Sequence, residues 1–279
     1  MNQQKRGFSG KRKGNDRNRR VGGPARDWKP RPDRSRDRRP FDKTEKRFDS
    51  KPYKAGIQPH KFQGIFTMRK GKNQLFLTQN MVPGKKVYEE DLYKDKGVEY
   101  REWSTKRSKL GAALAKNVSQ FGIYPGNTVL YLGASTGTTS SHVSDLVGPE
   151  GFVFALDFAP VTTRNLVYLC AERQNMTPIL GDARHPQRFA QYVGWVDTVF
   201  QDIAQRDQAE IFIKNCKAFL KKGGFGILVV KARSVDVGKR PKDVFKQVKD
   251  YLEKNITIVD YRELAPFEKD HCIFVCKKK

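Results

Sequence analysis

The sequence predicts an α/β fold in which a mostly parallel β-sheet carries helices on both faces. From residue 104 onward, short runs of β-branched, aliphatic and aromatic residues alternate with runs of helical spacing, which is the pattern of parallel strands joined by crossover helices. The clearest strand, 129–132, leads into a loop of small residues that contains Gly133 and Gly137. A strand, a glycine loop and a helix in this order form the place where open α/β sheets bind nucleotides.

The order of hydrophobic runs and turn residues defines the elements of this sheet. We expect strands at 129–132, 151–156, 178–180, 196–200, 225–230, 256–261 and 272–275. We expect helices at 104–121, 140–147, 161–174, 186–192, 208–220 and 244–252, with Gly223 and Gly224 capping the fifth of them. Only a loop joins the last two strands, so these two are expected to run antiparallel to each other.

Composition divides the chain into three segments. Residues 1–56 form a basic tail that contains Gly and Arg. Its first 54 residues carry 20 Lys and Arg against 7 Asp and Glu and almost no aliphatic side chains, so we expect disorder. Residues 57–103 are expected to form a small β-rich N-terminal domain, with a hairpin across 64–78 and a short strand at 86–88. Residues 104–279 form the predicted α/β domain.

The net charge of +25 points to a polyanionic partner, with nucleic acid as the first candidate. About half of this charge lies in the tail, and a tail rich in Lys and Arg can also serve solubility alone. The rest of the chain also has more Lys and Arg than Asp and Glu, and aromatic residues stand among the arginines of the tail. Both observations favour nucleic acid as the partner. No apolar run reaches membrane-spanning length and no secretion signal is visible, so we expect a soluble, intracellular protein without a membrane partner.

The four cysteines do not form a metal-binding or disulfide pattern. They lack CxxC spacing and a nearby histidine ladder, and three of them lie in apolar periodic segments. We therefore expect buried, reduced thiols and no structural metal. The cysteines are Cys170, Cys216, Cys272 and Cys276.

Glycine and polar residues end the predicted strands, at the edge where such sheets bind ligands. They are Gly133, Asp157, Asp182, Asp202 and Lys231. Asp157 is placed to accept hydrogen bonds from both hydroxyls of a ribose, and Asp182 to reach an adenine amino group or to cap the helix that follows. The loop lacks both GxGxxG and the Lys-Ser/Thr ending of a phosphate-binding loop, so NAD and ATP are weaker candidates than S-adenosylmethionine.

Five motifs, taken together and in order, resemble those of the fibrillarin family. They are Leu132-Gly-Ala-Ser-Thr-Gly-Thr-Thr-Ser-Ser-His-Val-Ser-Asp145, Gly181-Asp-Ala-Arg-His-Pro186, Gln201-Asp-Ile-Ala-Gln205, Val230-Lys-Ala-Arg-Ser234 and Pro266-Phe-Glu-Lys-Asp-His271. The similarity implies a Rossmann-like class I S-adenosylmethionine-dependent methyltransferase sheet. It also implies guide-RNA-directed 2′-O-ribose methylation of ribosomal RNA, and of transfer RNA, by a box C/D ribonucleoprotein. Asp157 departs from the family pattern, because glutamate is common there.

Methyl transfer to a ribose hydroxyl needs positive groups beside the developing alkoxide and a route for its proton. Lys231 is placed to orient the hydroxyl and Asp202 to hold the Lys231 ammonium, whereas the catalytic roles of Lys109 and His271 follow from the resemblance. Taken singly, Lys231 and Asp202 also fit a strand-end lysine and a loop cap, but their adjacency favours the catalytic interpretation. The expected cofactor-binding residues are Gly133, Ala134, Ser135, Gly137, Thr138, Thr139, Asp157, Phe158, Asp182, Ala183, Asp202, Ile203, Ala204 and Gln205.

The resemblance also implies the partners. A box C/D guide RNA pairs with the target RNA, while a coiled-coil scaffold protein of the Nop family and a kink-turn-binding ribosomal-type protein hold the enzyme over the target ribose. Two alternatives stay open: methylation of protein (histone) glutamine, and a non-catalytic structural role in an RNA particle. The runs 211–215 and 219–224 are of archaeal type, which favours a cytoplasmic location, whereas a eukaryotic source would place the protein in the nucleolus.

Overall fold

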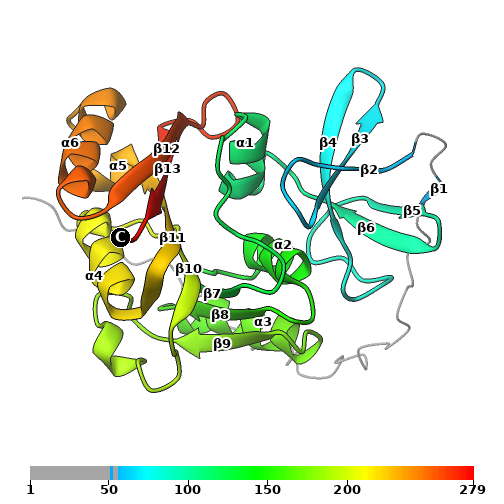
Figure 1. Cartoon of the computed structure of the whole chain (residues 1–279), viewed down its shortest axis with the longest axis horizontal. Helices are drawn as coiled ribbons and strands as arrows, with labels where there is room; N and C mark the ends of the chain where they lie inside the picture. Colours follow the sequence, from blue (N-terminus) through cyan, green and yellow to red (C-terminus); the bar gives the residue numbers. More distant parts are fainter. Residues whose placement is uncertain (1–50, 53–55) are drawn as a thin grey trace, which may run out of the picture. The chain divides into compact units, whose positions relative to one another are not determined.

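The computed structural model describes residues 51–52 and 56–279 of the chain. The prediction of a disordered tail at 1–56 therefore lies almost entirely outside the described residues. Residues 46–279 belong to one unit, and it contains a six-stranded sheet and a seven-stranded sheet (Figure 1). The six-stranded sheet comes first along the chain, and the seven-stranded sheet follows helix α1 (Lys109–Ala115).

The N-terminal sheet has the strand order β1-β5-β6-β4-β3-β2. Its strands are β1 (Lys51–Pro52), β2 (Gln58–Pro59), β3 (Ile65–Lys70), β4 (Asn73–Gln79), β5 (Leu92–Asp95) and β6 (Val98–Glu102). The antiparallel pair β3–β4 confirms the hairpin predicted across 64–78. The strand predicted at 86–88 is wrong. The backbone N–H groups of Val87 and Tyr88 donate instead to the Glu90 carboxylate, at 2.9 and 2.7 Å, so a local turn satisfies them without a neighbouring strand.

The second sheet has the strand order β12-β13-β11-β10-β7-β8-β9. Its strands are β7 (Thr128–Leu132), β8 (Phe152–Asp157), β9 (Met176–Leu180), β10 (Val196–Gln201), β11 (Leu220–Lys231), β12 (Thr257–Glu263) and β13 (His271–Lys277). Neighbouring strands from β9 to β11 pair in parallel, whereas β13 pairs antiparallel with both β11 and β12, as the sequence predicts for the last two strands. The carboxyl ends of the parallel strands therefore meet at one edge of the sheet.

Five of the α-helices follow the predicted order with different bounds, and the short helix at 232–235 was not predicted. After α1, the helices are α2 (Thr138–Val147), α3 (Pro160–Ala171), α4 (Gln208–Phe219), α5 (Ala232–Val235) and α6 (Pro241–Glu253). Helix α1 begins later than predicted, because Ser108 is its N-cap and its side chain accepts a hydrogen bond from the Gly111 N–H. In the part of the chain that the structure describes, no helix is long and apolar enough to cross a membrane.

Two local predictions are wrong. Residues 186–192 form only the 3₁₀ helix η1 (Pro186–Arg188), and the Val193 N–H then donates to the carbonyl three residues earlier at 3.3 Å. Gly223 and Gly224 lie inside β11 and do not cap α4. The register between β10 and β11 shifts near them, so the two glycines allow an irregularity at the start of a long strand.

Side chains on the two faces of the second sheet form separate hydrophobic clusters. Alternate residues of β7 divide between them, because successive side chains of a strand point to opposite faces. Val129 and Tyr131 belong to the cluster that includes side chains of α1, α2 and α3, whereas Leu130 and Leu132 belong to the cluster that includes those of α4 and α6. Helices therefore cover both faces of the sheet, as predicted.

A buried network of charged side chains connects the N-terminal sheet to α2. The Arg101 guanidinium of β6 lies 2.8 Å from Glu90 Oε1 and 2.7 Å from Asp145 Oδ2, and none of these three side chains is exposed. Arg173 binds the other oxygen of Asp145, also at 2.7 Å. Asp145 belongs to the helix that follows the glycine loop, so this network fixes the N-terminal sheet against the element that begins at the loop.

Candidate active site

The glycine loop connects β7 to α2 at the carboxyl edge of the second sheet. Gly133 has a φ of +88°, and a Cβ atom there would overlap the carbonyl oxygen of Asp202. Gly137 has a φ of +97°, and a Cβ atom there would overlap the side chain of Leu169. Only glycine fits both positions. The loop therefore brings its backbone directly against the end of β10.

Asp157, at the end of β8, organises this loop. Its Oδ2 accepts a hydrogen bond from the Ser135 N–H at 2.8 Å. Its Oδ1 accepts hydrogen bonds from the Ala159 N–H and the Thr162 hydroxyl, both at 2.9 Å. A carboxylate offers about four lone-pair positions, so these three bonds leave acceptor capacity for a ligand hydroxyl.

A cavity of about 330 Å³ opens at these strand ends. The predicted cofactor residues that line it are Gly133, Ser135, Asp157, Phe158, Asp182, Ala183, Asp202, Ile203, Ala204 and Gln205. Leu156, Gly181 and Arg184 also line it and were not predicted. Four predicted residues do not line it: Ala134 is buried, Gly137 is the N-cap of α2, and Thr138 and Thr139 begin that helix.

The chemistry of the cavity wall fits a nucleoside. The apolar side chains of Leu156 and Ile203 offer surface to a planar base. The carboxylates of Asp157 and Asp182 offer acceptors for hydroxyl and amino donors. The helix-cap alternative for Asp182 is wrong, because His185 is the N-cap of the 3₁₀ helix that follows. The Asp182 Oδ1 instead accepts the Arg184 N–H of its own loop at 2.9 Å.

Arg184 ties together the two loops that border the cavity. Its guanidinium donates to the Gln205 side chain and lies 3.4 Å from Asp207 Oδ2. Helix α4 also holds the loop after β9, because the buried side-chain amide of Asn215 donates to the Ala183 carbonyl at 2.8 Å. Arg184 stands within the motif at 181–186, but nothing in the residue pattern shows that it contacts the loop after β10.

Lys109 and Asp202 meet beside the cavity. The distance from Lys109 Nζ to Asp202 Oδ2 is 3.1 Å, and both side chains are largely buried. Burial alone would lower the pKa of the Lys109 ammonium. The charge and hydrogen bond of Asp202, with a further contribution from the charge of Glu268, outweigh burial and raise the pKa of Lys109 above its ordinary value. Lys109 therefore carries a proton at neutral pH.

Lys231 and His271 face each other across adjacent strands. Lys231 ends β11 and His271 begins β13, and the two residues are directly opposite in the antiparallel register. The sequence predicts that Asp202 holds Lys231, but the structure pairs Asp202 with Lys109. His271 Nδ1 lies 2.6 Å from the Lys269 carbonyl oxygen. A carbonyl oxygen only accepts hydrogen bonds, so Nδ1 carries a hydrogen, and in the neutral imidazole Nε2 is then the acceptor.

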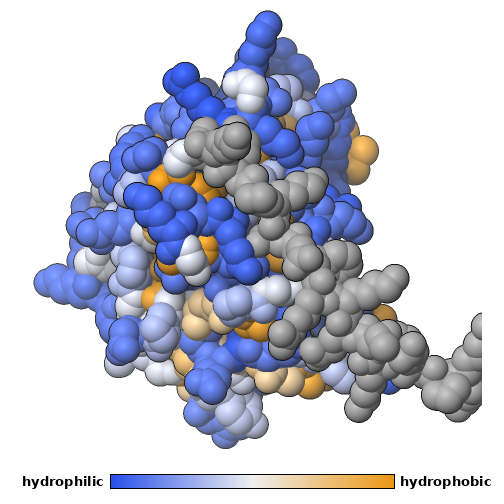
Figure 2. Space-filling view, turned by 90° about the vertical axis from the view of Figure 1, so that its right-hand side faces the viewer, coloured by the Kyte–Doolittle hydropathy of each residue, from blue (hydrophilic) through white to orange (hydrophobic). Residues whose placement is uncertain are grey.

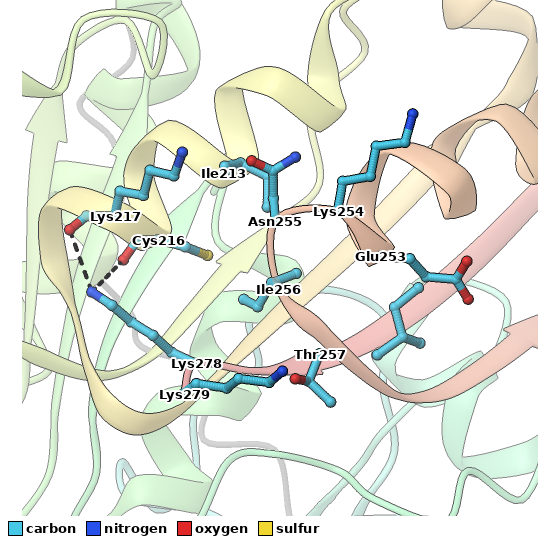
Figure 3. Close-up of a pocket in the computed structure, with 11 residues that line it drawn as sticks. Ile213, Cys216, Lys217, Glu253, Lys254, Asn255, Ile256, Thr257, Lys278 and Lys279 are labelled. Atoms are coloured by element: carbon cyan, nitrogen blue, oxygen red, sulfur yellow. Dashed lines mark hydrogen bonds between the residues drawn. The ribbon is translucent and has the colours of Figure 1, made fainter.

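A larger cavity, of about 630 Å³, lies at the opposite edge of the sheet (Figure 3). Lys277, at the end of β13, pairs with Phe225 near the start of β11, whereas His271 pairs with Lys231 at its end. At this cavity the Lys278 ammonium donates to the carbonyl oxygens of Cys216, Lys217 and Leu220 at 3.1, 3.3 and 2.6 Å. These bonds satisfy carbonyls at the C-terminal end of α4, so Lys278 has a structural role there.

The cysteines lie where the sequence places them. Cys216, Cys272 and Cys276 are buried and Cys170 is partly buried, and all four are free thiols. Burial raises the pKa of the Cys170 thiol to about 11 and that of Cys276 to about 12, so these two groups are protonated at neutral pH. In the described ranges, no group of three or more His, Cys, Asp and Glu side chains is gathered as a metal site would require.

Comparisons with known proteins give the same assignment for most of the chain. The family model of fibrillarin matches residues 57–279. The fibrillarin-like rRNA/tRNA 2′-O-methyltransferase of Thermococcus onnurineus is 49% identical over 223 residues, which cover 80% of this chain and 99% of that protein.

Solved structures agree with this assignment. The fibrillarin of Aeropyrum pernix, solved with natively bound S-adenosyl-L-methionine, is 38% identical with a TM-score of 0.74, and the match covers 79% of this chain and 97% of that one. The match to a chain of a fibrillarin/Nop5p complex has 33% identity and a TM-score of 0.71, and it covers 78% of this chain and 99% of that one. This chain therefore belongs to the fibrillarin family.

Proposed function

We propose that this chain transfers a methyl group from S-adenosylmethionine to ribose 2′-hydroxyl groups of ribosomal and transfer RNA. One observation carries the proposal. Asp202 lines the cavity at the strand ends and is also the ion-pair partner of Lys109, at 3.1 Å. A cofactor site and a charged pair suited to alkoxide chemistry therefore share one residue. The name of the Thermococcus relative and the cofactor bound to the Aeropyrum fibrillarin support the same activity.

The residues of the cavity divide the binding of the cofactor between them. When bound, S-adenosylmethionine supplies an electrophilic methyl group on a positively charged sulfur. Asp157 would accept a hydrogen bond from a ribose hydroxyl of the cofactor, and Asp182 would accept one from the adenine amino group. Leu156 and Ile203 would offer apolar surface to the base, and Arg184 keeps the two bordering loops together.

Four side chains act on the target ribose. The ammonium groups of Lys109 and Lys231 stabilise the alkoxide that develops on the 2′-oxygen, and Asp202 fixes Lys109 in place. His271 Nε2 accepts the proton that the hydroxyl releases, because its Nδ1 is already engaged with the Lys269 carbonyl.

We also propose that the target ribose is chosen by partners. One matching solved structure contains a fibrillarin with Nop5p, which supports a scaffold protein of the Nop family for this chain. A box C/D guide RNA that pairs with the target, and a kink-turn-binding protein that anchors the guide, complete the proposed particle. The face shown in Figure 2 is mostly hydrophilic and its hydrophobic atoms form separate patches, which suits a polar partner such as RNA.

The experiment that tests this function is reconstitution followed by product mapping. The full chain is combined with a Nop-family scaffold, a kink-turn-binding protein, a guide RNA and a target RNA, and the methylated positions are mapped by mass spectrometry. We expect one methylated ribose in the target, at the position selected by the guide. Methyl groups on protein glutamine with none on RNA would contradict the proposal, and an assembled particle without methylation would indicate a structural subunit.

A further inference from the structure

The loop at 264–271, which carries His271, is closed by a backbone hydrogen bond and tied to α5 by an ion pair. At its ends, the Leu264 N–H donates to the His271 carbonyl at 2.9 Å. Near its end, the Arg233 side chain lies 3.1 Å from the Asp270 carboxylate. Asp270 has a φ of +57°, which turns the backbone sharply just before β13 begins. The imidazole of His271 is therefore presented from a defined backbone position.

Glu268 lies inside this loop and points at the same imidazole. Its Oε2 is 3.9 Å from His271 Nδ1, and the side chains are 20% and 11% exposed. The Glu268 N–H donates to the Leu264 carbonyl at 3.1 Å, so the backbone of the glutamate is held by the loop itself. The hydrogen on Nδ1 therefore faces both a carbonyl oxygen, that of Lys269, and a carboxylate.

Glu268 is also close enough to influence Lys109. Burial lowers the pKa of the Lys109 ammonium, and Asp202 raises it more strongly than any other group. The charge of Glu268 also raises it. The Glu268 carboxylate is therefore close to two parts of the site, and among the described residues no hydrogen bond or ion pair joins these two parts. One is the Lys109–Asp202 pair, and the other is His271 with its cross-strand neighbour Lys231.

We propose that Glu268 is a positioning residue of the methyl-transfer site, whose carboxylate stabilises the imidazolium that forms on His271 during the reaction. The inference rests on the proposed function. In the transfer, the C–S bond breaks as the C–O bond forms, and sulfur leaves as a neutral thioether. The 2′-O–H bond breaks, and the proton forms a new N–H bond at His271 Nε2. The positive charge that His271 gains lies beside the Glu268 carboxylate.

A purely structural role would have a different signature. If Glu268 only helped the loop to fold, its substitution would lower stability and would weaken every function of the site together. If it acts through His271, its substitution lowers the rate of transfer, and the loss disappears once His271 is absent.

The test compares Glu268→Gln, His271→Ala and the double variant in the reconstituted particle with guide and target RNA. Glu263→Gln, which removes an exposed carboxylate at the end of β12, is the matched control. Rates are measured as kcat and KM for target RNA, cofactor binding by calorimetry, and folding by thermal unfolding. If Glu268→Gln proves unstable, Glu268→Asp, which keeps the charge on a shorter side chain, takes its place.

The expected result is a kcat up to about 100-fold lower for Glu268→Gln, with KM, cofactor affinity and unfolding temperature unchanged and with Glu263→Gln fully active. The double variant should be no slower than His271→Ala alone. Wild-type activity in Glu268→Gln, or losses that multiply in the double variant, would overturn the inference. Because the wild-type particle is assayed alongside, failure of the inference and failure of the proposed function are told apart.

Discussion

Arg101 of β6 and Asp145 of α2 form an ion pair with an Nη1···Oδ2 distance of 2.7 Å, and neither side chain has any exposed surface. This pair lies between the N-terminal sheet and the helix that follows the glycine loop. Removal of one member of a buried pair leaves an uncompensated charge in a medium that solvates it poorly. The contact between the N-terminal sheet and α2 therefore depends on charge as well as on apolar packing.

Substitution of Arg101 by Met should lower the free energy of unfolding by about 3–5 kcal/mol, because Glu90 and Asp145 both lose their guanidinium partner. Chemical denaturation measures this difference. Arg107→Met is the matched control, since Arg107 pairs with Glu89 on the surface, where a pair contributes about 1 kcal/mol at most. Equal losses in the two variants would show that the buried network has no special role.

His142 should make the fold less stable in mild acid. It is buried between the Thr78 and Tyr88 hydroxyls, at 2.8 and 2.7 Å. Burial, with the nearby charges of Arg101 and Arg173, lowers the pKa of His142 well below 6.5. Below about pH 6.5 the unfolded chain therefore binds a proton at this residue that the folded chain does not bind, and folding stability falls.

The pH dependence of unfolding tests this assignment. In the wild type, the free energy of unfolding should decline from pH 7 to pH 5, by up to about 1.4 kcal/mol per pH unit from His142 alone. His142→Gln removes the titrating group, so its decline should be shallower. Because burial also lowers the pKa of His60, His60→Gln is the matched comparison. Parallel curves for the wild type and His142→Gln would count against the assignment.

Asp157→Asn should weaken binding of S-adenosylmethionine by about 10- to 100-fold, since hydrogen bonds to a charged group contribute about 1.5–3 kcal/mol. Asparagine also retains only part of the hydrogen bonding to Ser135, Ala159 and Thr162. Isothermal calorimetry measures the affinity. Asp250→Asn, an exposed position on α6, should bind the cofactor as the wild type does. Unchanged affinity in Asp157→Asn would remove this carboxylate from the cofactor site.

Gly133→Ala should abolish cofactor binding and methylation, because the added methyl group would overlap the Asp202 carbonyl at a backbone φ of +88°. Gly194→Ala is the control, since a Cβ at that position has open space around it. Calorimetry and the methylation assay both report the effect. A Gly133→Ala variant with wild-type affinity would mean that the loop does not need the close approach to β10 seen in the structure.

The sequence predicts the parallel strands well because they are continuous apolar runs that end in glycine or polar residues. It does not predict β5, and it does not predict β6 because that strand contains two buried charged residues, Glu99 and Arg101. From the sequence alone, charged residues are expected at the surface, because their buried partners are not known. The network of Arg101 with Glu90 and Asp145 supplies these partners from distant parts of the chain.

In the candidate site, too, local features can be predicted from the sequence, whereas contacts with distant residues cannot. Strand-end residues such as Asp157 and Asp202 can be located from the sequence, because the topology brings all strand ends to one edge. Contacts between loops cannot be located in this way. The sequence therefore predicts a pair of Asp202 with Lys231, whereas the structure pairs Asp202 with Lys109. Arg184 was missed for the same reason, since its partner Gln205 belongs to a different loop.

The most direct test of the central claim is the rate of ribose methylation by Lys231→Met in the reconstituted particle, measured beside cofactor affinity. The claim is that a cationic strand-end side chain acts on the target hydroxyl next to a separately built cofactor cavity. Lys231 does not line that cavity. The account therefore predicts unchanged affinity for S-adenosylmethionine and a rate lower by at least about 100-fold. Methylation at the wild-type rate by Lys231→Met would contradict it.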